Sequence, residues 1–368
     1  MPDSLSVTML PAKEGDCLVV AYGPNDARKY ILIDGGRAWT YKNALQQYLA
    51  DHGIQELELL VVTHVDRDHI DGVLSLMQDG TLDLKVKYVW FNTWDHLIGN
   101  TIEVVQQEED ELESFGAKMG EELSPLIVQK GWPWNHQFAG AAVALAEQPH
   151  DNVIELEELK LTLLSPNREK LDELKPEWKK QCEKAGITPG AVLEEYVLDE
   201  DDDLESFGVI DIEALAAEAF VDDQSKANGS SIALILEYDG HKLLLAGDAH
   251  AGLLESQLRA HGATADAPLR IDAFKISHHG SKYNVSRELL ELLDCKNFLV
   301  STNGNYFKHP DDVAMARLIK FGTPDSTIHF NYKTDHNDHW HNQAWEQQYR
   351  YQVEFPETGS DGYEVVNF

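Results

Sequence analysis

The feature that most restricts this chain is the ten-residue segment 63–72, THVDRDHIDG, which directly follows the apolar run Leu59–Val62. An apolar run of this length is typical of a buried strand. The turn that ends the strand carries imidazoles and carboxylates, which are potential metal ligands. His64 and Asp66 can face one ion, while Asp68 and His69 can face another. The segment therefore predicts a dinuclear metal centre, and the alternative is a polar turn whose histidines are merely solvated.

Three further apolar runs end in residues of a matching kind. Each run is typical of a strand, and the polar residues that follow the three runs are Asp34, then Asp248, then His278 and His279. Two glycines after Asp34 let the backbone approach a site closely, and we expect Asp34 to support the ligands from behind. Carboxylates and imidazoles are the ligands that hard to borderline divalent ions need.

These motifs resemble the metallo-β-lactamase superfamily and, within it, the hydrolase domain of the DNA-uptake channel protein ComEC. The resemblance covers roughly residues 5–95 and 228–320, and its motifs are Gly15-Asp16-Cys17, LIDGG, THxDxDHxDG, LLLAGDA, SHHGS, Ser301-Thr302-Asn303 and His309-Pro310. It implies an α/β fold, a four-layer αββα sandwich with ions at the strand ends on one edge. Alternating strands and helices are consistent with that architecture.

The resemblance also implies a role for each motif residue. His64, Asp66, Asp68 and His69 correspond to the first ligand cluster, and Asp248 corresponds to the carboxylate that bridges both ions. One of His278 and His279 is implied as the last imidazole. We favour His278 because it comes straight off the strand, and the neighbouring His279 stays open.

Two departures from the superfamily pattern bear on the metal. Asp66 stands where the commoner loop has a histidine, which makes the first site richer in oxygen. Asn228 stands near the place where the superfamily usually has a further histidine. We therefore expect one or two divalent ions, with manganese favoured over zinc by these changes.

Two divalent cations suit hydrolysis, because they lower the pKa of a bridging water and stabilise an oxyanion at phosphorus or at a carbonyl. We expect Asp68 to orient that water. His309 could act as general acid for the leaving oxygen, or it could be a loop histidine fixed by packing beside Pro310. Lys282 could contact a phosphate, or it could simply be exposed.

The formal charge of the chain is -34, and residues 101–227 carry -21 of it, with 31 acidic residues against 10 basic ones. The acidic runs lie at 106–113 and 198–203, and runs of like charge are usually solvated or disordered. The functional alternative is a surface that docks a basic protein partner or mimics nucleic acid. Unaided binding of nucleic acid is disfavoured, because it requires Lys and Arg facing the phosphates.

We expect one hydrolase domain over residues 1–368, with a mainly helical acidic insertion at 101–227 and terminal strands at 325–368. Helices are predicted at 166–185 and 210–220, and a hairpin at 153–164. The start of the chain has no signal-peptide pattern, no apolar stretch is long enough to span a membrane, and the three cysteines form no framework. A cytoplasmic protein is the expectation.

Two aromatic or histidine-rich segments admit a functional interpretation. Trp132 and Trp134 could line a substrate wall, although a packed loop is the more common role of such residues. Four histidines between residues 329 and 341 could form a second metal site, but a polar turn between strands explains them as well.

Three functions remain open from the sequence. The first is a metal-dependent phosphodiesterase that acts on nucleic acid or nucleotides through a metal-activated water, which the resemblance supports. The second is a hydrolase of small phosphoesters or lactones, which the acidic surface favours. The third is a component of a larger assembly that keeps the metal fold for partner binding, with the insertion as the docking surface.

Overall fold

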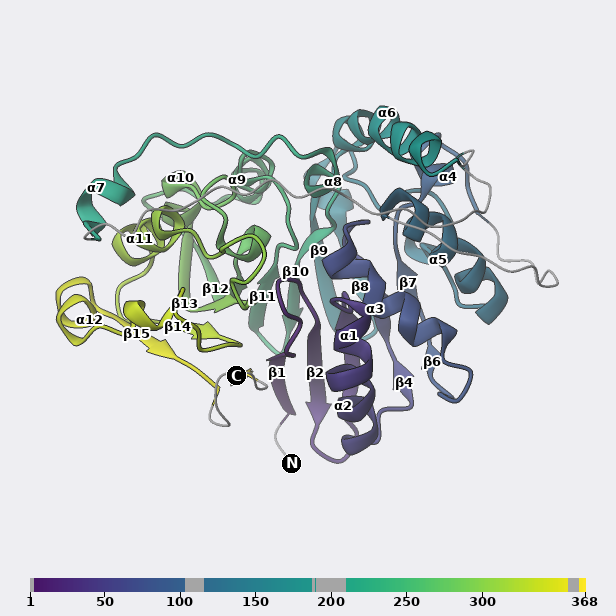
Figure 1. Cartoon of the computed structure of the whole chain (residues 1–368), viewed down its shortest axis with the longest axis horizontal. Coiled ribbons are helices and arrows are strands. Elements are labelled where there is room, and N and C mark those ends of the chain that lie inside the picture. Colours follow the sequence, from purple (N-terminus) through teal and green to yellow (C-terminus); the bar gives the residue numbers. More distant parts are fainter. Residues whose placement is uncertain (1–2, 103–115, 187–188, 190–209, 357–363) are drawn as a thin grey trace.

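The computed structural model describes residues 3–102, 116–186, 189, 210–356 and 364–368. Two β-sheets lie face to face in the middle of the molecule, and helices cover the outer face of each (Figure 1). This is the four-layer αββα arrangement that the resemblance implied. Within the described ranges, no helix combines the length and apolar character needed to span a membrane.

The first sheet has six strands in the order β16-β1-β2-β3-β5-β7: β16 (Glu364–Asn367), β1 (Asp3–Met9), β2 (Leu18–Pro24), β3 (Lys29–Ile33), β5 (Leu59–Val61) and β7 (Val89–Trp90). Strands β3, β5 and β7 run parallel to one another. The carboxyl ends of β3 and β5 therefore meet at the same edge of the sheet. A separate parallel pair is formed by β4 (Glu56–Leu57) and β6 (Lys85–Val86).

The second sheet has eight strands in the order β15-β14-β13-β12-β11-β10-β9-β8: β15 (Tyr351–Glu354), β14 (Ser326–Phe330), β13 (Leu293–Val300), β12 (Leu269–Lys275), β11 (His241–Leu245), β10 (Ala233–Tyr238), β9 (Leu159–Ser165) and β8 (Val153–Leu156). The strands from β11 to β15 are parallel. Apolar side chains from both sheets, among them Val20, Ile31, Leu161 and Leu234, form the core between them.

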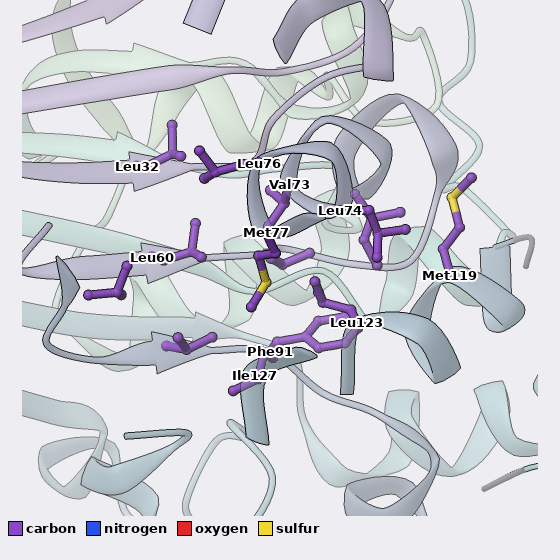
Figure 2. Packing of buried hydrophobic residues seen from close by; sticks show 14 of the residues in the cluster. Leu32, Leu60, Val73, Leu74, Leu76, Met77, Phe91, Met119, Leu123 and Ile127 are labelled. Atoms are coloured by element: carbon purple, nitrogen blue, oxygen red, sulfur yellow. The ribbon is translucent and has the colours of Figure 1, made fainter. Parts of the chain in front are cut away.

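The outer layer of the first sheet contains α1 (Ala38–Thr40), α2 (Gln46–Asp51), α3 (Arg67–Gln78), α4 (Trp94–Leu97), α5 (Gly116–Lys130) and α6 (Arg168–Lys184). Helix α3 has apolar residues at the three- and four-residue spacing of an amphipathic helix. Figure 2 shows its Val73, Leu76 and Met77 beside Leu32 and Leu60 of the sheet, which belong to the same buried cluster. This packing fixes the start of α3, and therefore the predicted ligands, against the ends of β3 and β5.

The outer layer of the second sheet contains α7 (Ile212–Ala216), α9 (Ala251–Ala260), α10 (Arg287–Glu291), α11 (Asp312–Phe321) and α12 (Gln343–Tyr349). The short helix α8 (Lys226–Gly229) contacts α6. Leu254, Leu289 and Leu318 are buried against sheet residues such as Phe274 and Phe298. A second helix layer therefore covers the strands that lead to Asp248 and His278.

The predicted elements of residues 101–227 can be compared with the described part of that segment. The helices predicted at 166–185 and 210–220 are confirmed as α6 and α7, and the predicted hairpin is confirmed as β8 and β9 at one end of the second sheet. Trp132 and Trp134 are buried in the hydrophobic core, so they form a packed loop and no substrate wall. The acidic runs at 106–113 and 198–203 lie outside the described residues.

The four C-terminal histidines do not come together as a metal site among the described residues. His329 lies near Asn297, His339 near Asp312 and His341 near Glu346. His336 packs beside the backbone at Gly304. Each imidazole has a different neighbourhood, in agreement with the polar-turn interpretation.

Candidate metal centre

The structure brings the ends of four predicted strands to one place. The ends of β3 and β5 supply Asp34 and the segment from His64 to His69, and the ends of β11 and β12 supply Asp248 and His279. Side-chain atoms of His64, His69 and Asp248 lie within 4.8 Å of one another, and so do those of Asp68, His69 and His279. All of these residues are buried. Two overlapping groups of potential ligands therefore lie side by side between the sheets.

Two imidazoles of this cluster are held by their Nδ1 atoms. His69 Nδ1 lies 2.8 Å from Asp34 Oδ2, and His279 Nδ1 lies 2.8 Å from the Ser301 carbonyl oxygen. Both partners can only accept, so each Nδ1 carries a proton, and Nε2 is the ring atom that could bind a metal once its own proton has left. The two Nε2 atoms are 3.3 Å apart. Two ligands about 2.1 Å from one ion at a tetrahedral angle lie roughly that far apart.

His64 is oriented through a hydroxyl relay. The Thr63 hydroxyl donates to Asp34 Oδ2 at 2.7 Å, so its oxygen can accept the His64 Nδ1 proton at 3.0 Å. Ser231 Oγ also lies 3.0 Å from that nitrogen. Asp34 therefore holds His69 directly and His64 through Thr63, which is the supporting position predicted for it. His64 Nε2 is buried and has no hydrogen-bond partner.

Asp248 lies between the two groups. Its Oδ2 is 3.4 Å from His69 Nε2, 3.7 Å from His279 Nε2 and 3.8 Å from His64 Nε2. Asp68 Oδ2 is 3.5 Å from His279 Nε2. Asp248 Oδ1 is buried and has no hydrogen-bond partner. Unpaired buried polar atoms are costly, and several that converge on one point are what a bound cation would satisfy.

The electrostatics of the cluster also favour a cation. Burial alone would lower the pKa of His279, but the Asp248 and Asp16 carboxylates outweigh it and raise the pKa to about 9. Burial would likewise raise the pKa of Asp16, but the Lys275 ammonium and His279 bring it to about 2. The cluster contains four buried carboxylates (Asp16, Asp34, Asp68 and Asp248) that favour positive charge beside them, and its donor set of imidazoles and carboxylates fits a divalent metal such as zinc or manganese.

His278 and His279 have different positions. Both residues have positive φ, at 48° and 53°, so the turn directs their side chains apart. His278 Nε2 also faces Asp248, at 3.9 Å, but its ring is partly exposed and it belongs to neither compact group. Its Nδ1 lies 3.0 Å from Asn284 Oδ1 and 3.3 Å from Asn228 Nδ2. The geometry favours His279 as the ligand beside Asp68, and a role for His278 as a ligand stays a prediction.

The remaining predicted residues lie at the margin of the cluster. Asp66 Oδ2 is 3.5 Å from His64 Nε2, and the Asp66 side chain is 42% exposed. His309 packs edge-on against the ring of His278, with 5.1 Å between the centroids, and its Nδ1 lies 3.3 Å from Asp311 Oδ1. Burial lowers the pKa of His309, and Asp311 only partly opposes this effect.

Three glycines let the loops around the centre touch backbone to backbone. A Cβ atom at Gly15 would lie 1.8 Å from the Asp68 carbonyl oxygen, and one at Gly72 would lie 1.9 Å from the Gly35 carbonyl oxygen. The Gly35 amide donates to the His69 carbonyl at 2.8 Å. Any side chain at these positions would push α3 and its ligands away from the neighbouring loops.

Comparison with known proteins gives distant matches. No protein-family model matches the chain. Over 356 residues it is 20% identical to ComE operon protein 3 of Bacillus subtilis (strain 168), a match that covers 89% of this chain and 33% of that protein. The chain thus spans about a third of the length of that relative.

Solved structures that match the chain at low similarity include the metallo-beta-lactamase fold protein YhfI from Bacillus subtilis, at 9% identity and a TM-score of 0.41 over 100% of both chains. A diphosphatase from the PhnP family is 10% identical, with a TM-score of 0.39 over 100% of this chain and 98% of that one. In the present chain, two facing sheets with outer helices bring imidazoles and carboxylates together at one edge. This is the αββα arrangement that the metallo-β-lactamase resemblance implied.

Some residues around this centre were not predicted as site residues. Asp16 is buried beside His279, and its Oδ2 pairs with Lys275 Nζ at 2.7 Å. Asp223 Oδ2 accepts from Asn228 Nδ2 at 2.7 Å and lies 3.5 Å from His278 Nδ1. The Gly15-Asp16-Cys17 motif was a signal for Asp16. Asp223 follows Asp222 in a segment without a motif, so the sequence offered no signal for it.

Proposed function

We propose that this protein is a metal-dependent hydrolase of phosphoesters, and that its substrates are phosphodiesters of nucleic acid or nucleotides. The observation that carries the proposal is the convergence of buried ligand atoms, with His64 Nε2 and Asp248 Oδ1 lacking any hydrogen-bond partner. Three imidazoles whose Nδ1 protons are fixed elsewhere support it, since such positioning is typical of metal ligands.

His64, Asp66 and Asp248 would hold one divalent ion, and Asp68, His69, His279 and Asp248 would hold the other. Bound divalent ions lower the pKa of water and neutralise developing charge on phosphoryl oxygens. The carboxylate at position 66 adds oxygen to the first group, which favours manganese over zinc there.

Asp68 is proposed to orient the attacking water. Burial would raise its pKa, but His69 and His279 reverse the effect, so the pKa lies below its ordinary value and the side chain is ionised. An ionised carboxylate can only accept hydrogen bonds, and it can hold a water in the direction of attack.

His309 is proposed to give a proton to the leaving oxygen. Its position beside His278 supports this role, and because burial lowers its pKa, the phosphate of a bound substrate would have to raise that pKa again. The test compares two leaving groups. A nucleoside alkoxide needs a proton as it departs, whereas p-nitrophenolate does not. His309→Gln should slow hydrolysis of a dinucleotide at least tenfold more than hydrolysis of a p-nitrophenyl diester. Equal losses on both substrates would remove His309 from this role.

Elemental analysis followed by a diesterase screen with manganese and zinc tests the whole proposal. We expect one or two ions per chain after mild purification and turnover of a p-nitrophenyl diester. Fewer than roughly 0.2 ions per chain, with no uptake of added manganese or zinc, would refute the metal centre. Full metal loading without turnover of any ester would favour a partner-binding role instead.

Small phosphoesters or lactones form the second candidate class of substrates. The net charge of -34 favours it, because a strongly negative protein repels long polyanions. Turnover of small esters without turnover of dinucleotides or oligonucleotides would select this class.

A further inference from the structure

A cavity of about 490 Å³ lies beside the metal centre and plays no part in the chemistry described above. Its lining includes Lys13, Glu14, Arg37, Trp39, Arg67 and Tyr306. Arg67 stands between the predicted ligands Asp66 and Asp68, and Glu14 lies two residues before Asp16. The segments that build the centre therefore also build the cavity.

Cations in this cavity pack on aromatic rings. Lys13 Nζ lies 4.7 Å from the centroid of the Trp39 ring, and the Arg37 guanidinium lies 5.8 Å from that of Tyr306. A ring beside a cation offers a planar surface for another ring and a positive charge for an anion.

The aromatic rings around the centre are unusually exposed. Of the described residues, the large aromatic side chains that are exposed to solvent are Trp39 at 38%, Tyr283 at 45%, Tyr306 at 46% and Phe307 at 46%. Trp39 and Tyr306 line the cavity, and Phe307 packs against Tyr306 with 4.6 Å between the ring centroids. Exposed aromatic rings that gather at one place mark a binding surface.

The charge of the cavity differs from that of the chain. Three of its lining residues are cationic and two, Glu14 and Asp71, are acidic, whereas the whole chain has 30 basic and 64 acidic residues. Arg37 is held by Glu14 at 2.5 Å, and Arg67 lies 3.5 Å from Asp71. The Lys13 ammonium lies over the Trp39 ring and faces the cavity. A local excess of positive charge thus exists in a strongly negative protein.

A row of rings connects the cavity with the centre. Tyr306 and Phe307 are 4.6 Å apart, and Phe307 and His309 are 6.1 Å apart. The ring of His309 contacts that of His278, which faces Asp248. The row of rings therefore leads from Tyr306 in the cavity lining to His278 beside Asp248.

We propose that this cavity binds one nucleotide unit of a single-stranded substrate, with its base against Trp39 or Tyr306 and its phosphate near Lys13 and Arg67. This inference rests on the proposed phosphodiesterase function. It adds that the substrate is single-stranded, and it names the residues that would recognise the nucleotide. Single strands fit because a base can reach a protein ring only when it is not stacked in a duplex.

The test uses two substrates with the same scissile bond, the p-nitrophenyl ester of thymidine 5′-monophosphate and methyl p-nitrophenyl phosphate. The parent should prefer the nucleotide ester. Trp39→Ala should lower the ratio of the two kcat/KM values about tenfold, as loss of one stacked base does. Lys13→Gln, which removes the cation expected to face the phosphate, should lower that ratio about tenfold as well. Trp39→Phe keeps a ring and should restore most of the ratio. Arg287→Gln is the matched control, since Arg287 packs over Phe321 away from the cavity.

Binding is measured separately from hydrolysis, so that failure of the proposed phosphodiesterase function can be distinguished from failure of the proposed nucleotide site. If neither ester is hydrolysed, the proposed function fails, and the cavity is tested by fluorescence anisotropy with a labelled twelve-residue oligothymidine strand and with the matching duplex. Tighter binding of the single strand, weakened about tenfold by Trp39→Ala, supports the cavity as a nucleotide site. An unchanged kcat/KM ratio in all variants, or equal binding of strand and duplex, overturns it.

Discussion

Helix α4, which holds His96, and the candidate ligand cluster, which holds His279, each bury an imidazole, and the two surroundings shift its pKa in opposite directions. Burial lowers the pKa of His96 to about 4, whereas nearby carboxylates raise that of His279 to about 9. The Thr93 backbone amide donates to His96 Nδ1 at 3.1 Å, so a proton on that nitrogen would face another donor.

The difference shows that burial of histidine alone does not make a cation site. His96 is a structural residue that closes a turn and packs against Trp134, with 4.9 Å between the ring centroids. His279 has acceptors on both sides, with Ser301 and Asp16 at Nδ1 and Asp68 and Asp248 at Nε2. A surplus of buried acceptors is therefore the property that separates the candidate centre from a packed histidine.

The largest expected effect comes from removing one of those acceptors. Asp68→Ala should lower hydrolysis of a p-nitrophenyl diester about a thousandfold or more, because a carboxylate that is both ligand and water acceptor is lost. Initial rates of p-nitrophenyl diester hydrolysis at saturating manganese measure this loss. Asp51→Ala, an exposed carboxylate in α2, is the control and should leave the rate as it is. A variant at position 68 that kept most of its activity would contradict the assignment of the centre.

The buried pair of Asp16 and Lys275 should show the next largest effect. Lys275→Met leaves Asp16 ionised and unpaired beside His279, which should lower the free energy of unfolding by about 3 to 5 kcal/mol. Urea denaturation at pH 7 measures this. Adding Asp16→Asn to Lys275→Met should recover part of the loss, because no lone buried charge remains. Equal stability of the single and double variants would mean that the pair is not electrostatically coupled.

We expect His96 to affect folding stability with the opposite pH dependence from a histidine that is paired with a carboxylate. The folded protein keeps His96 neutral down to about pH 4, whereas the unfolded chain binds the proton near its ordinary value of 6.5. Its contribution to stability is therefore complete above pH 6.5 and is lost as the pH falls toward 4, about 3 kcal/mol in all.

His96→Gln isolates that contribution from those of other groups. The stability difference between parent and variant, measured by urea denaturation at several pH values, should shrink by about 3 kcal/mol between pH 6.5 and 4. A difference that stayed constant over this range would show that His96 takes up its proton as easily in the folded protein as in the unfolded one.

The smallest expected effect concerns the acidic segment, whose charge opposes the basic cavity. Cleavage of long DNA should be poor at low salt and should improve as salt rises, because screening weakens the repulsion between carboxylates and phosphates. Replacing Asp199, Asp201, Asp202 and Asp203 by Asn should raise activity on long DNA more than activity on a small diester. Cleavage rates between 20 and 300 mM salt measure this effect. Steep inhibition by salt in both the parent and the four-Asn variant would contradict the prediction.

The residues that gather at the candidate centre could be predicted because each lies within a few residues of an apolar run that forms a strand. Such a run identifies the end of a strand without any long-range information. The choice between His278 and His279 could not be made, since it depends on a turn in which both residues have positive φ.

The cavity could not be predicted for a different reason. Lys13, Arg37 and Tyr306 are far apart in the sequence, and each is an ordinary surface residue where it stands. Helix α1 contacts α3, and the Asn303 amide donates to the Lys13 carbonyl oxygen at 2.7 Å, so contacts between distant segments bring these residues to one place. The overall charge of -34 argued against a basic site. A net charge, however, does not say where the 30 Lys and Arg residues lie in the folded protein.

The glycine contacts at positions 15, 35 and 72 have a consequence for engineering and for evolutionary change. With the three loops in backbone contact, α3 has no room to move relative to the first hairpin or to the end of β3. We therefore expect that the side chain at position 66 can be exchanged, and any metal preference altered, while the main chain stays in place. A one-residue insertion in any of the three loops would displace several of the clustered side chains at once, so loop length is more tightly constrained here than the side chain at position 66.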